Sequence, residues 1–278
     1  MHRVATVLFA AVLAVGAPSA QPPPPATPPA TPPATPPAVP EAVDAVRAVR
    51  AASPVTVDGR LDEPAWASAP TTEGFRQSRV NEGAPSRQRT AVRILYDDDA
   101  LYVGARMYDT APDSVVSQLS RRDVSIPTTD EFAVYLDPYH DRRSGYFFAV
   151  NVAGTLIDGT MSNDGNFEFS WDGVWTARPA RDAEGWTAEI RVPFSQLRFA
   201  QADVQTWGVN FQRVLARHGE ESFLRPVASS ETGFVSHFRD LTGIERVRPP
   251  QGFEVAPYVT SRAAFQDGGA GNPFNDGS

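Results

Sequence analysis

The sequence contains neither cysteine nor lysine in its 278 residues. Without cysteine the chain can form no disulfide scaffold, thiolate zinc site, thiol nucleophile or lipid-anchored N-terminal cysteine. Without lysine it can use no Schiff base, and no lysine of a phosphate-binding loop or a kinase. The net charge of −8 argues against nucleic acid as a partner, because phosphate binding needs a concentrated basic surface.

Proline is scarce outside one segment, since 12 of the 26 prolines lie in residues 18–40. Such a tract favours extended polyproline II and cannot pack a core, so we predict a Pro-rich linker over residues 21–50. Its last ten residues (EAVDAVRAVR) predict a short, weak helix.

The N-terminus has the order of a secretory signal: a basic start, an apolar run from Val4 to Val15, and small residues up to Ala20. The run of 12 apolar residues is too short to span a bilayer as a helix. We therefore predict a signal peptide over residues 1–20. The protein would then be exported to the periplasm, outer membrane or cell surface.

Strand patterns dominate residues 51–248. Apolar residues alternate through VRILYDDDALYVG, with an aspartate turn between two runs, and again through residues 131–152 around a turn at Pro138. Helical patterns are confined to Glu63–Ser68 and Ser195–Leu197. This predicts an all-β fold: an antiparallel β-sandwich, immunoglobulin-like or jelly-roll-like. Residues 249–278 hold one strand pattern and a glycine-rich loop, which we interpret as the start of a truncated C-terminal β region.

One strand breaks its own alternation. Arg213 falls on the same face as Trp207, Val209 and Phe211. Either a β-bulge intervenes or the arginine points inward. The bulge is the more ordinary interpretation.

Four motifs, in sequence order, resemble the family 9 carbohydrate-binding module. They are VTVDGRLDEPAW from Val55, VRILYDDDALYVG from Val92, DEFAVYLD from Asp130 and GWTAEIRVPF from Gly185. The variants WDGVW from Trp171 and IRVPFSQLRF from Ile190 resemble a bacterial surface subfamily. There the module is exported and precedes an outer-membrane β-barrel of unassigned function. The resemblance implies a β-sandwich, a glycan or cell-surface polysaccharide as partner, and an outer-membrane partner through a following barrel.

The site of that family carries over only in part. The resemblance implies a sugar held between two tryptophans, with acidic, amide and arginine side chains on its hydroxyls. Glu131 matches the acidic position and Asn151 an amide position. The first clamp tryptophan is replaced by Ser125 or Ile126, and the arginine by Phe147 or Phe148.

Sugar recognition needs aromatic faces for C–H groups and planar polar groups for hydroxyls. Trp171 and Trp175 flank a turn in an aromatic-rich stretch and are candidate stacking platforms, although core packing is the commoner fate of tryptophan. Trp66 and Trp186 lie on regular apolar patterns and are predicted core residues. Candidate hydrogen-bonding residues are Glu131, Asn151, Arg93 and Arg213.

Metal and enzyme signals are weak. A structural calcium with Asp158, Asn163 and Asp164 as ligands is a candidate, because calcium takes six to eight oxygen ligands, but no EF-hand spacing is present. No other cofactor is predicted. No nucleophile elbow, zinc-protease motif or phosphate-binding loop occurs.

We therefore predict a carbohydrate-binding module with no catalytic residues, linked to carbohydrate catabolism. Two alternatives remain open. One is a structural or partner-binding domain of an outer-membrane barrel protein that has no sugar site. The other is an accessory part of a glycoside hydrolase acting on O-glycosyl bonds, which would need two carboxylates about 5–10 Å apart.

Overall fold

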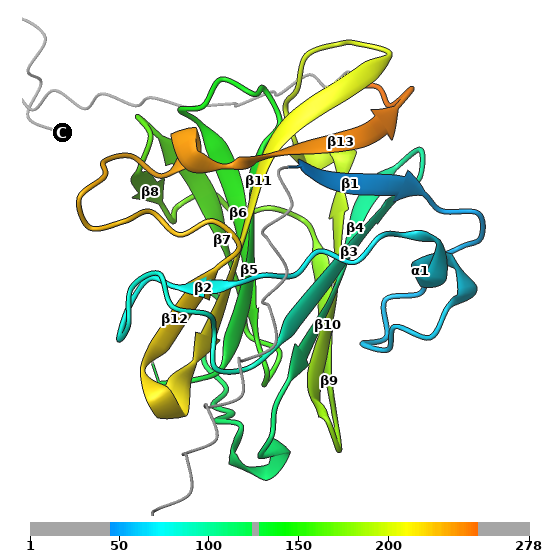
Figure 1. Ribbon diagram of the computed structural model, residues 1–278. Helices are drawn as coiled ribbons and strands as arrows, with labels where there is room; N and C mark the ends of the chain where they lie inside the picture. The colour runs from blue at the N-terminus through cyan, green and yellow to red at the C-terminus, as the bar shows by residue number, and fades with distance from the viewer. Residues whose placement is uncertain (1–44, 124–127, 250–278) are drawn as a thin grey trace, which may run out of the picture. The chain divides into compact units, whose positions relative to one another are not determined.

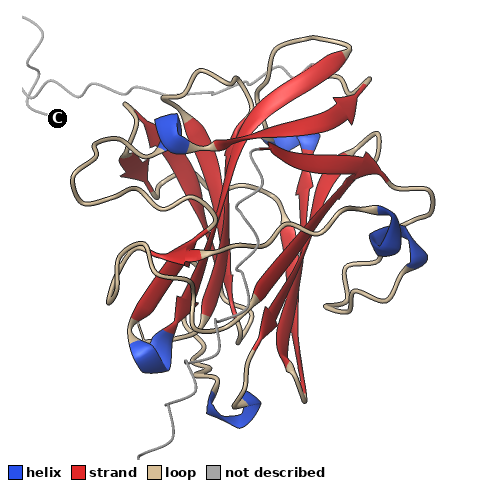
Figure 2. Ribbon diagram, in the orientation of Figure 1, coloured by secondary structure: helices blue, strands red, loops and turns tan. Residues whose placement is uncertain are grey.

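Strands make up most of the regular secondary structure in the computed structural model, which describes residues 45–123 and 128–249 (Figures 1 and 2). The chain divides into two units, residues 1–38 and 39–278, and every described residue lies in the second. The predicted signal peptide, most of the linker and nearly all of the predicted C-terminal region lie outside the described residues.

The first layer of the sandwich is antiparallel and has the strand order β8-β7-β6-β5-β11-β13. Two short strands extend it, because β12 pairs with β11 and β2 pairs with β12. The bounds are β2 Arg76–Gln77, β5 Glu131–Asp137, β6 Gly145–Asn151, β7 Leu156–Ser162, β8 Asn166–Glu168, β11 Val204–Leu215, β12 Glu220–Phe223 and β13 Arg239–Glu245.

The second layer has the order β3-β4-β10-β9 and is also antiparallel. Its bounds are β3 Thr90–Tyr96, β4 Ala100–Tyr108, β9 Thr176–Asp182 and β10 Gly185–Pro193. The hairpin predicted around the aspartate turn is confirmed as β3–β4, and the one around Pro138 as β5–β6.

Strand β1 (Ala45–Arg50) joins the two layers, because it pairs in parallel with β13 on one side and with β3 on the other. The prediction of a weak helix in a linker was therefore wrong for these residues. Val46 and Ala48 point into the core, and two neighbouring strands supply hydrogen-bond partners. The antiparallel β-sandwich prediction is confirmed apart from these two parallel pairings.

Helical structure is short and lies at strand connections. The α-helix α1 spans Pro64–Ser68, close to its predicted bounds. Single 3₁₀ turns are η1 Pro112–Ser114, η2 Phe194–Gln196, η3 Ala216–His218 and η4 Val235–His237. Among the described residues, no helix has the length and apolar character needed to cross a membrane.

The main hydrophobic core fills the space between the two layers. Trp186 of β10 and Trp207 of β11 are fully buried in it, so the core position predicted for Trp186 is confirmed. The stacked pair Phe132 and Phe211 lies in the same core, with ring centroids 6.0 Å apart. Burial of aromatic and aliphatic side chains from both inner faces is the main stabilisation of such a sandwich.

Each layer also has an outer face that a connecting segment covers only in part. Over the first layer, Val235 and Phe238 pack on Tyr135 and its neighbours. Over the second, Ala65 and Trp66 of α1 pack on Tyr102 and Leu95. Trp66 is thus buried as predicted, but outside the main core. The uncovered remainder of each outer face is where the two cavities described below lie.

Arg213 points inward, so the interpretation as a bulge at this residue was wrong. The β11–β5 register is regular from Gly208 to Val214, and the irregularity of β11 lies instead between Gln205 and Trp207, opposite β13. The guanidinium is 1% exposed. It donates hydrogen bonds across the sandwich to the carbonyls of Arg89 and Tyr108 and to the hydroxyl of Thr90. Burial lowers the pKa of Arg213 to about 10, so it stays charged at neutral pH.

Candidate functional site

A groove of about 350 Å³ lies on the outer face of the first layer. We call it the aromatic groove. Its floor comes from β5, β6, β7 and β11, and its rim from β12, the β8 region and the segment before β3. The lining residues are Arg79, Thr129, Glu131, Tyr135, Phe147, Ala149, Ile157, Phe167, Phe169, Gln212, Val214 and Glu221.

Two phenylalanine rings are open to solvent in this groove. Phe167 is 41% and Phe169 49% exposed, although both are large apolar side chains. Phe167 lies in β8 (Asn166–Glu168) and Phe169 directly follows it, and their rings are nearly parallel, with an interplanar angle of 25° and a centroid distance of 6.5 Å. The edge of Phe147 supports both from below, at 5.5 Å and 5.2 Å. The result is a fixed aromatic platform of the kind that binds apolar faces of ligands.

Polar groups stand on the floor and opposite rim of the aromatic groove. Glu131 and Gln212 point from neighbouring strands β5 and β11, and Glu221 comes from β12. The Tyr135 hydroxyl donates to Gln212 Oε1 at 2.5 Å and so orients that amide. Burial, and to a lesser extent the charge of Glu221, raises the pKa of Glu131 to about 7. Near neutral pH this carboxyl can therefore either donate or accept a hydrogen bond.

The tryptophans predicted as stacking platforms lie elsewhere. Trp175 is 6% exposed and belongs to the main core, where it packs edge-on against Phe148. Trp171 is partly buried, packs against Tyr146 and covers Gly173. Core packing therefore accounts for Trp175, and partial packing against the core for Trp171.

Asn151 is fully engaged within the fold. Its Oδ1 accepts hydrogen bonds from the backbone N–H groups of Ala153 and Thr155, and its Nδ2 donates to the carbonyl of Gln118. It lies directly opposite Glu131 in the β5–β6 register, but its amide closes the β6–β7 turn. Of the six predicted sugar-binding residues, only Glu131 lies in the aromatic groove.

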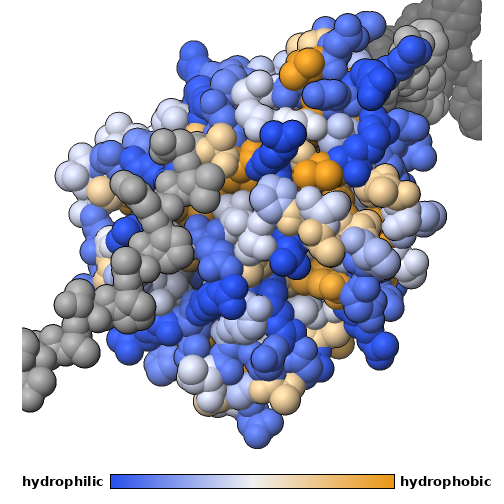
Figure 3. All heavy atoms as spheres, turned by 45° about the vertical axis from the view of Figure 1, so that its right-hand side comes forward, coloured by the Kyte–Doolittle hydropathy of each residue, from blue (hydrophilic) through white to orange (hydrophobic). Residues whose placement is uncertain are grey.

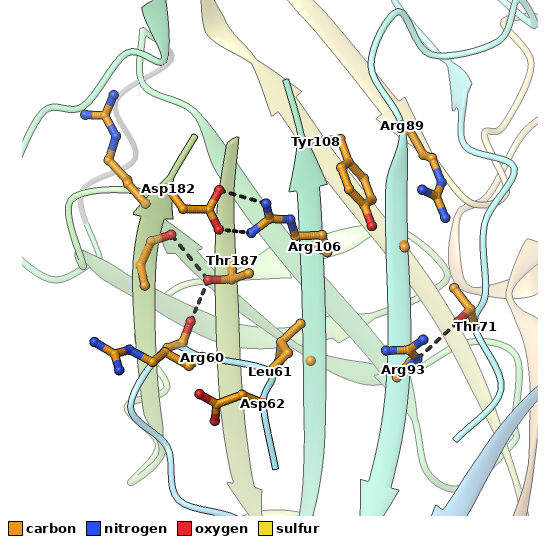
Figure 4. Close-up of a pocket in the computed structure, with 15 residues that line it drawn as sticks. Arg60, Leu61, Asp62, Thr71, Arg89, Arg93, Arg106, Tyr108, Asp182 and Thr187 are labelled. Carbon is orange, nitrogen blue, oxygen red and sulfur yellow. Dashed lines mark hydrogen bonds and ion pairs between the residues drawn. The ribbon is translucent and has the colours of Figure 1, made fainter. Parts of the chain in front are cut away.

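Arg93 lies in a different cavity, on the outer face of the second layer (Figure 4). This cavity, which we call the arginine cavity, has a volume of about 550 Å³. Small residues of neighbouring strands form its floor, and the loop before α1 forms one wall. The lining residues are Gly59, Arg60, Leu61, Asp62, Thr71, Arg89, Ala91, Arg93, Gly104, Arg106, Tyr108, Ala180, Arg181, Asp182 and Thr187.

The wall of the arginine cavity is anchored by a buried carboxylate. Glu189 of β10 is fully buried and accepts hydrogen bonds from the backbone N–H groups of Asp58 and Gly59 and from the indole of Trp66. Gly104 of β4 lies beneath Leu61 and Trp66 and has no room for a side chain, because a Cβ there would lie 2.7 Å from Leu61. The sequence motif VDGRLDEPAW thus becomes a strap held down on β4 and β10.

The predicted calcium ligands do not converge. Asp158 accepts hydrogen bonds from Arg122 and from the N–H of Gly173, whereas Asp164 accepts from Phe234 and Ser236. Four residues of extended strand, about 13 Å, separate Asp158 from the end of β7. Asp158 instead approaches Asp123 and Asp172. Arg122 forms ion pairs with all three carboxylates, so its single positive charge offsets part of theirs.

Sequence reasoning missed most of the aromatic groove. Phe167 and Phe169 belong to the aromatic-rich stretch around Trp171 and were not chosen as candidates, although their spacing of two would place both rings on one face of a strand. Gln212 alternates with the core residues Phe211 and Arg213, which indicates an outward side chain. Nothing in the sequence indicates that β12 carries Glu221 to the same face.

The molecule is thus a two-layer β-sandwich with a solvent-open aromatic groove on one face. Residues 57–228 match the carbohydrate family 9 binding domain-like family. The match covers 172 of 278 residues, so the chain belongs to this family, as the four motifs predicted. No curated protein matches the chain.

Two solved structures have a similar fold. One is a family 9 carbohydrate-binding module from Caldicellulosiruptor kristjanssonii in complex with cellotriose, with 17% identity, a TM-score of 0.53, and coverage of 77% of this chain and 100% of that one. The other is a putative carbohydrate-binding protein from Bacteroides uniformis, with 12% identity, a TM-score of 0.57, and coverage of 72% and 99%. At these identities the likeness establishes the β-sandwich fold.

Proposed function

We propose that this domain binds carbohydrate in the aromatic groove. The observation that carries the proposal is the exposed pair Phe167 and Phe169, fixed from below by Phe147. Exposure of large aromatic rings to water is unfavourable, and a ligand that covers them gains the free energy of burying that surface. The C–H face of a pyranose ring is a ligand of suitable shape and polarity.

The polar residues of the groove provide the complementary half of sugar recognition. Glu131, Gln212 and Glu221 offer carboxyl and amide groups to hydroxyls, and Arg79 at the rim forms an ion pair with Glu221 at 3.4 Å. Several planar polar groups around an apolar platform favour a polyhydroxylated, uncharged ligand. A negatively charged ligand would meet two carboxyl groups here.

Recognition in this groove would differ from a two-tryptophan clamp. Among residues 45–123 and 128–249, the tryptophans Trp66, Trp175, Trp186 and Trp207 are buried, and Trp171 is packed against the core. The platform is one-sided and made of phenylalanine. We therefore expect modest affinity for a single sugar and tighter binding of a chain that covers both rings. Cello-oligosaccharides are the first candidates, because the similar module from Caldicellulosiruptor kristjanssonii was solved with cellotriose.

We further propose export to the periplasm, outer membrane or cell surface, with an outer-membrane β-barrel as partner. The support is the signal-like order of residues 1–20 and the resemblance of the motifs to the bacterial surface subfamily. Fractionation of cells expressing the full gene tests this, and a wholly cytoplasmic, unprocessed protein would contradict it.

Calorimetry on the full chain with glucose, cellotriose and a glycan array tests the sugar site. The double variant Phe167→Ala/Phe169→Ala should lower affinity at least about tenfold, since stacking on each ring contributes roughly 1 kcal/mol. Tyr139→Ala is the matched control, because Tyr139 is 52% exposed and is not among the residues that line the groove. If no glycan binds the unaltered chain, the partner-binding alternative gains. Cleavage of a chromogenic glycoside would instead favour the hydrolase alternative.

A further inference from the structure

We propose that the arginine cavity is a second ligand site, which binds a small organic ligand through an oxyanion: a carboxylate, phosphate or sulfate group. This site would act independently of the aromatic groove, because the two lie on opposite outer faces of the sandwich. The inference therefore goes beyond the proposed sugar binding and does not require it.

The charge of the cavity is the first observation. Arginine supplies five of its fifteen lining residues, and aspartate supplies two. The whole chain has only 25 arginines in 278 residues and a net charge of −8. A concave surface that gathers positive charge in an acidic protein focuses the local potential on anions. In the space-filling view that brings the α1 side forward, hydrophobic residues appear only as patches among hydrophilic ones (Figure 3).

Arg93 is the central observation. It projects from β3 into the cavity and is partly buried. Its Nε donates to the hydroxyl of Thr71 at 3.1 Å, which fixes the guanidinium and leaves its terminal nitrogens facing the cavity (Figure 4). Within residues 45–123 and 128–249, no carboxylate forms an ion pair with it. A partly desolvated cation without a counter-charge is costly, and a bound oxyanion would compensate it.

Two further arginines are held in place by a shared aromatic ring. The guanidinium groups of Arg89 and Arg106 lie 4.5 Å and 5.2 Å from the centroid of Tyr108. Arg106 also forms a bidentate pair with Asp182 at 2.5 Å and 2.7 Å, and Arg89 pairs with Glu73. These contacts fix both arginines before any ligand arrives, which lowers the entropy lost on binding. The same carboxylates compensate much of the charge of Arg89 and Arg106, so the charge that remains for an anion is chiefly that of Arg93.

The floor leaves room for a ligand. Ala91 of β3 and Thr187 of β10 bear small side chains, while Leu61 and Trp66 lie over Gly104 of the strand between them. The volume of about 550 Å³ falls within the range of roughly 300–1,000 Å³ typical of small-molecule sites. The planar fork of Arg93 matches the two oxygens of a carboxylate, phosphate or sulfate. Selection of the anion by this fork distinguishes the cavity from the aromatic groove, where two carboxyl groups face the ligand.

The test uses the full chain and calorimetry with glucuronic acid, inorganic phosphate, inorganic sulfate and, as the neutral match, glucose. We expect at least one anion to bind more weakly as NaCl is raised, because salt screens the attraction. Tighter binding of glucuronic acid would identify a carboxylate as the group that the site recognises, and tighter binding of inorganic phosphate or sulfate would identify a phosphate or sulfate group. Glucose should not compete with the anion.

Arg93→Gln should weaken anion binding at least about tenfold, or about 1.4 kcal/mol, because it removes a charge-assisted hydrogen bond. Thr71→Ala should cause a smaller loss, because it only frees the guanidinium to rotate. The control is Arg143→Gln, which removes the same charge from the exposed β5–β6 turn of the other layer. Circular dichroism and melting confirm that each variant is folded. If Arg93→Gln does not fold, Arg93→Lys and Thr71→Ala carry the test.

The proposal would be overturned if none of the three anions bound at millimolar concentration. It would also be overturned by anion binding that Arg93→Gln or Arg93→Lys leaves unchanged. The double variant Phe167→Ala/Phe169→Ala should retain full anion affinity, so loss of the proposed sugar site and loss of the anion site give different results.

Discussion

The two outer faces of the sandwich are arranged in the same way but differ in the chemistry of their side chains. On each, a connecting segment covers one end of the sheet and leaves the other end open: residues around Phe238 over the first layer, and the strap before α1 over the second. The open end of the first layer presents phenylalanine rings and carboxyl groups, whereas that of the second presents arginines. The fold therefore provides the concave surfaces, and the outward residues of each strand decide what they bind.

The largest test of this comparison is Arg213→Ala, which should damage both faces together. Arg213 lies between the layers and hydrogen-bonds from β11 to Arg89, Thr90 and Tyr108 of the other layer. Its removal takes a donor away from the buried carbonyls and the more distant of two cations away from Asp109, which keeps its bidentate pair with Arg217. Breaking a buried charged network typically costs about 3–5 kcal/mol. Urea unfolding should show a loss of this size.

The exposed Arg178→Ala on β9 is the control, with an expected change within about 0.5 kcal/mol. A stability loss below about 1 kcal/mol for Arg213→Ala, on the same scale of buried-charge costs, would mean that the layers are held together without this residue.

A more selective test separates the faces. Glu189→Ala removes the acceptor shared by Asp58, Gly59 and Trp66, so the strap loses its anchor. The N–H of Gly59 loses its partner, whereas Asp58 and Trp66 keep one acceptor each, the carbonyl of Thr56 and the carboxylate of Glu63. We expect a destabilisation of about 2–4 kcal/mol, from the cost of buried unpaired groups. Anion affinity should fall with it, because the strap forms a wall of the arginine cavity.

Sugar affinity of Glu189→Ala, measured below its melting temperature, should be unchanged. Equal loss of both affinities would show that the two faces are coupled and would end the description of two independent sites.

The sequence predicts those parts of the fold that local patterns determine. The β3–β4 hairpin follows from alternation on both sides of an aspartate turn, because its pairing partners are neighbours in the chain. Strand β1 escaped prediction for the opposite reason. Its partner β13 lies nearly 200 residues away, and Arg47 and Arg50 interrupt its apolar pattern. Tertiary pairing, which a single sequence does not display, decides the structure there.

The same limit explains which site residues were found. Glu131 was identified because its motif resembles a known family. The remainder of the aromatic groove combines β5, β8, β11 and β12, which are distant in sequence and meet only through the sheet order. Arg213 was not predicted to be buried, for the same reason. Arginine is rarely buried, and the carbonyls that make burial tolerable here belong to the opposite layer, so the bulge was the more reasonable expectation.

A pH test sharpens the description of the aromatic groove. The pKa of Glu131 is raised to about 7, above its value in an unfolded chain, mainly by burial. Between about pH 4.5 and 7 the folded state therefore binds a proton that the unfolded state has released. Stability should fall as pH rises through this window and stay reduced above it.

The variant Glu131→Gln should remove this pH dependence and raise the free energy of unfolding at pH 8 by about 1–3 kcal/mol. Urea unfolding at pH 5 and pH 8 measures both effects. If the free energy of unfolding of Glu131→Gln changed with pH as much as that of the unaltered chain, the pH dependence would belong to other carboxyls. Asp172→Asn is the control with little expected effect, because Asp172 is the exposed member of the group formed with Asp123 and Asp158.

The smallest effect is expected at Asp182. It tests whether the ion pair between Asp182 and Arg106 limits the affinity of the arginine cavity for an anion. Asp182 is half exposed and pairs with Arg106, which lowers the pKa of Asp182. Asp182→Asn should weaken the fold by less than about 1 kcal/mol, as for exposed ion pairs. It should also release Arg106 toward the cavity and increase affinity for the anion about two- to fivefold. Because Glu184 is a second partner of Arg106, Glu184→Gln should add to the gain. A decrease in anion affinity would mean that Asp182 is needed to aim Arg106, so that ligand and aspartate share the guanidinium and do not compete for it.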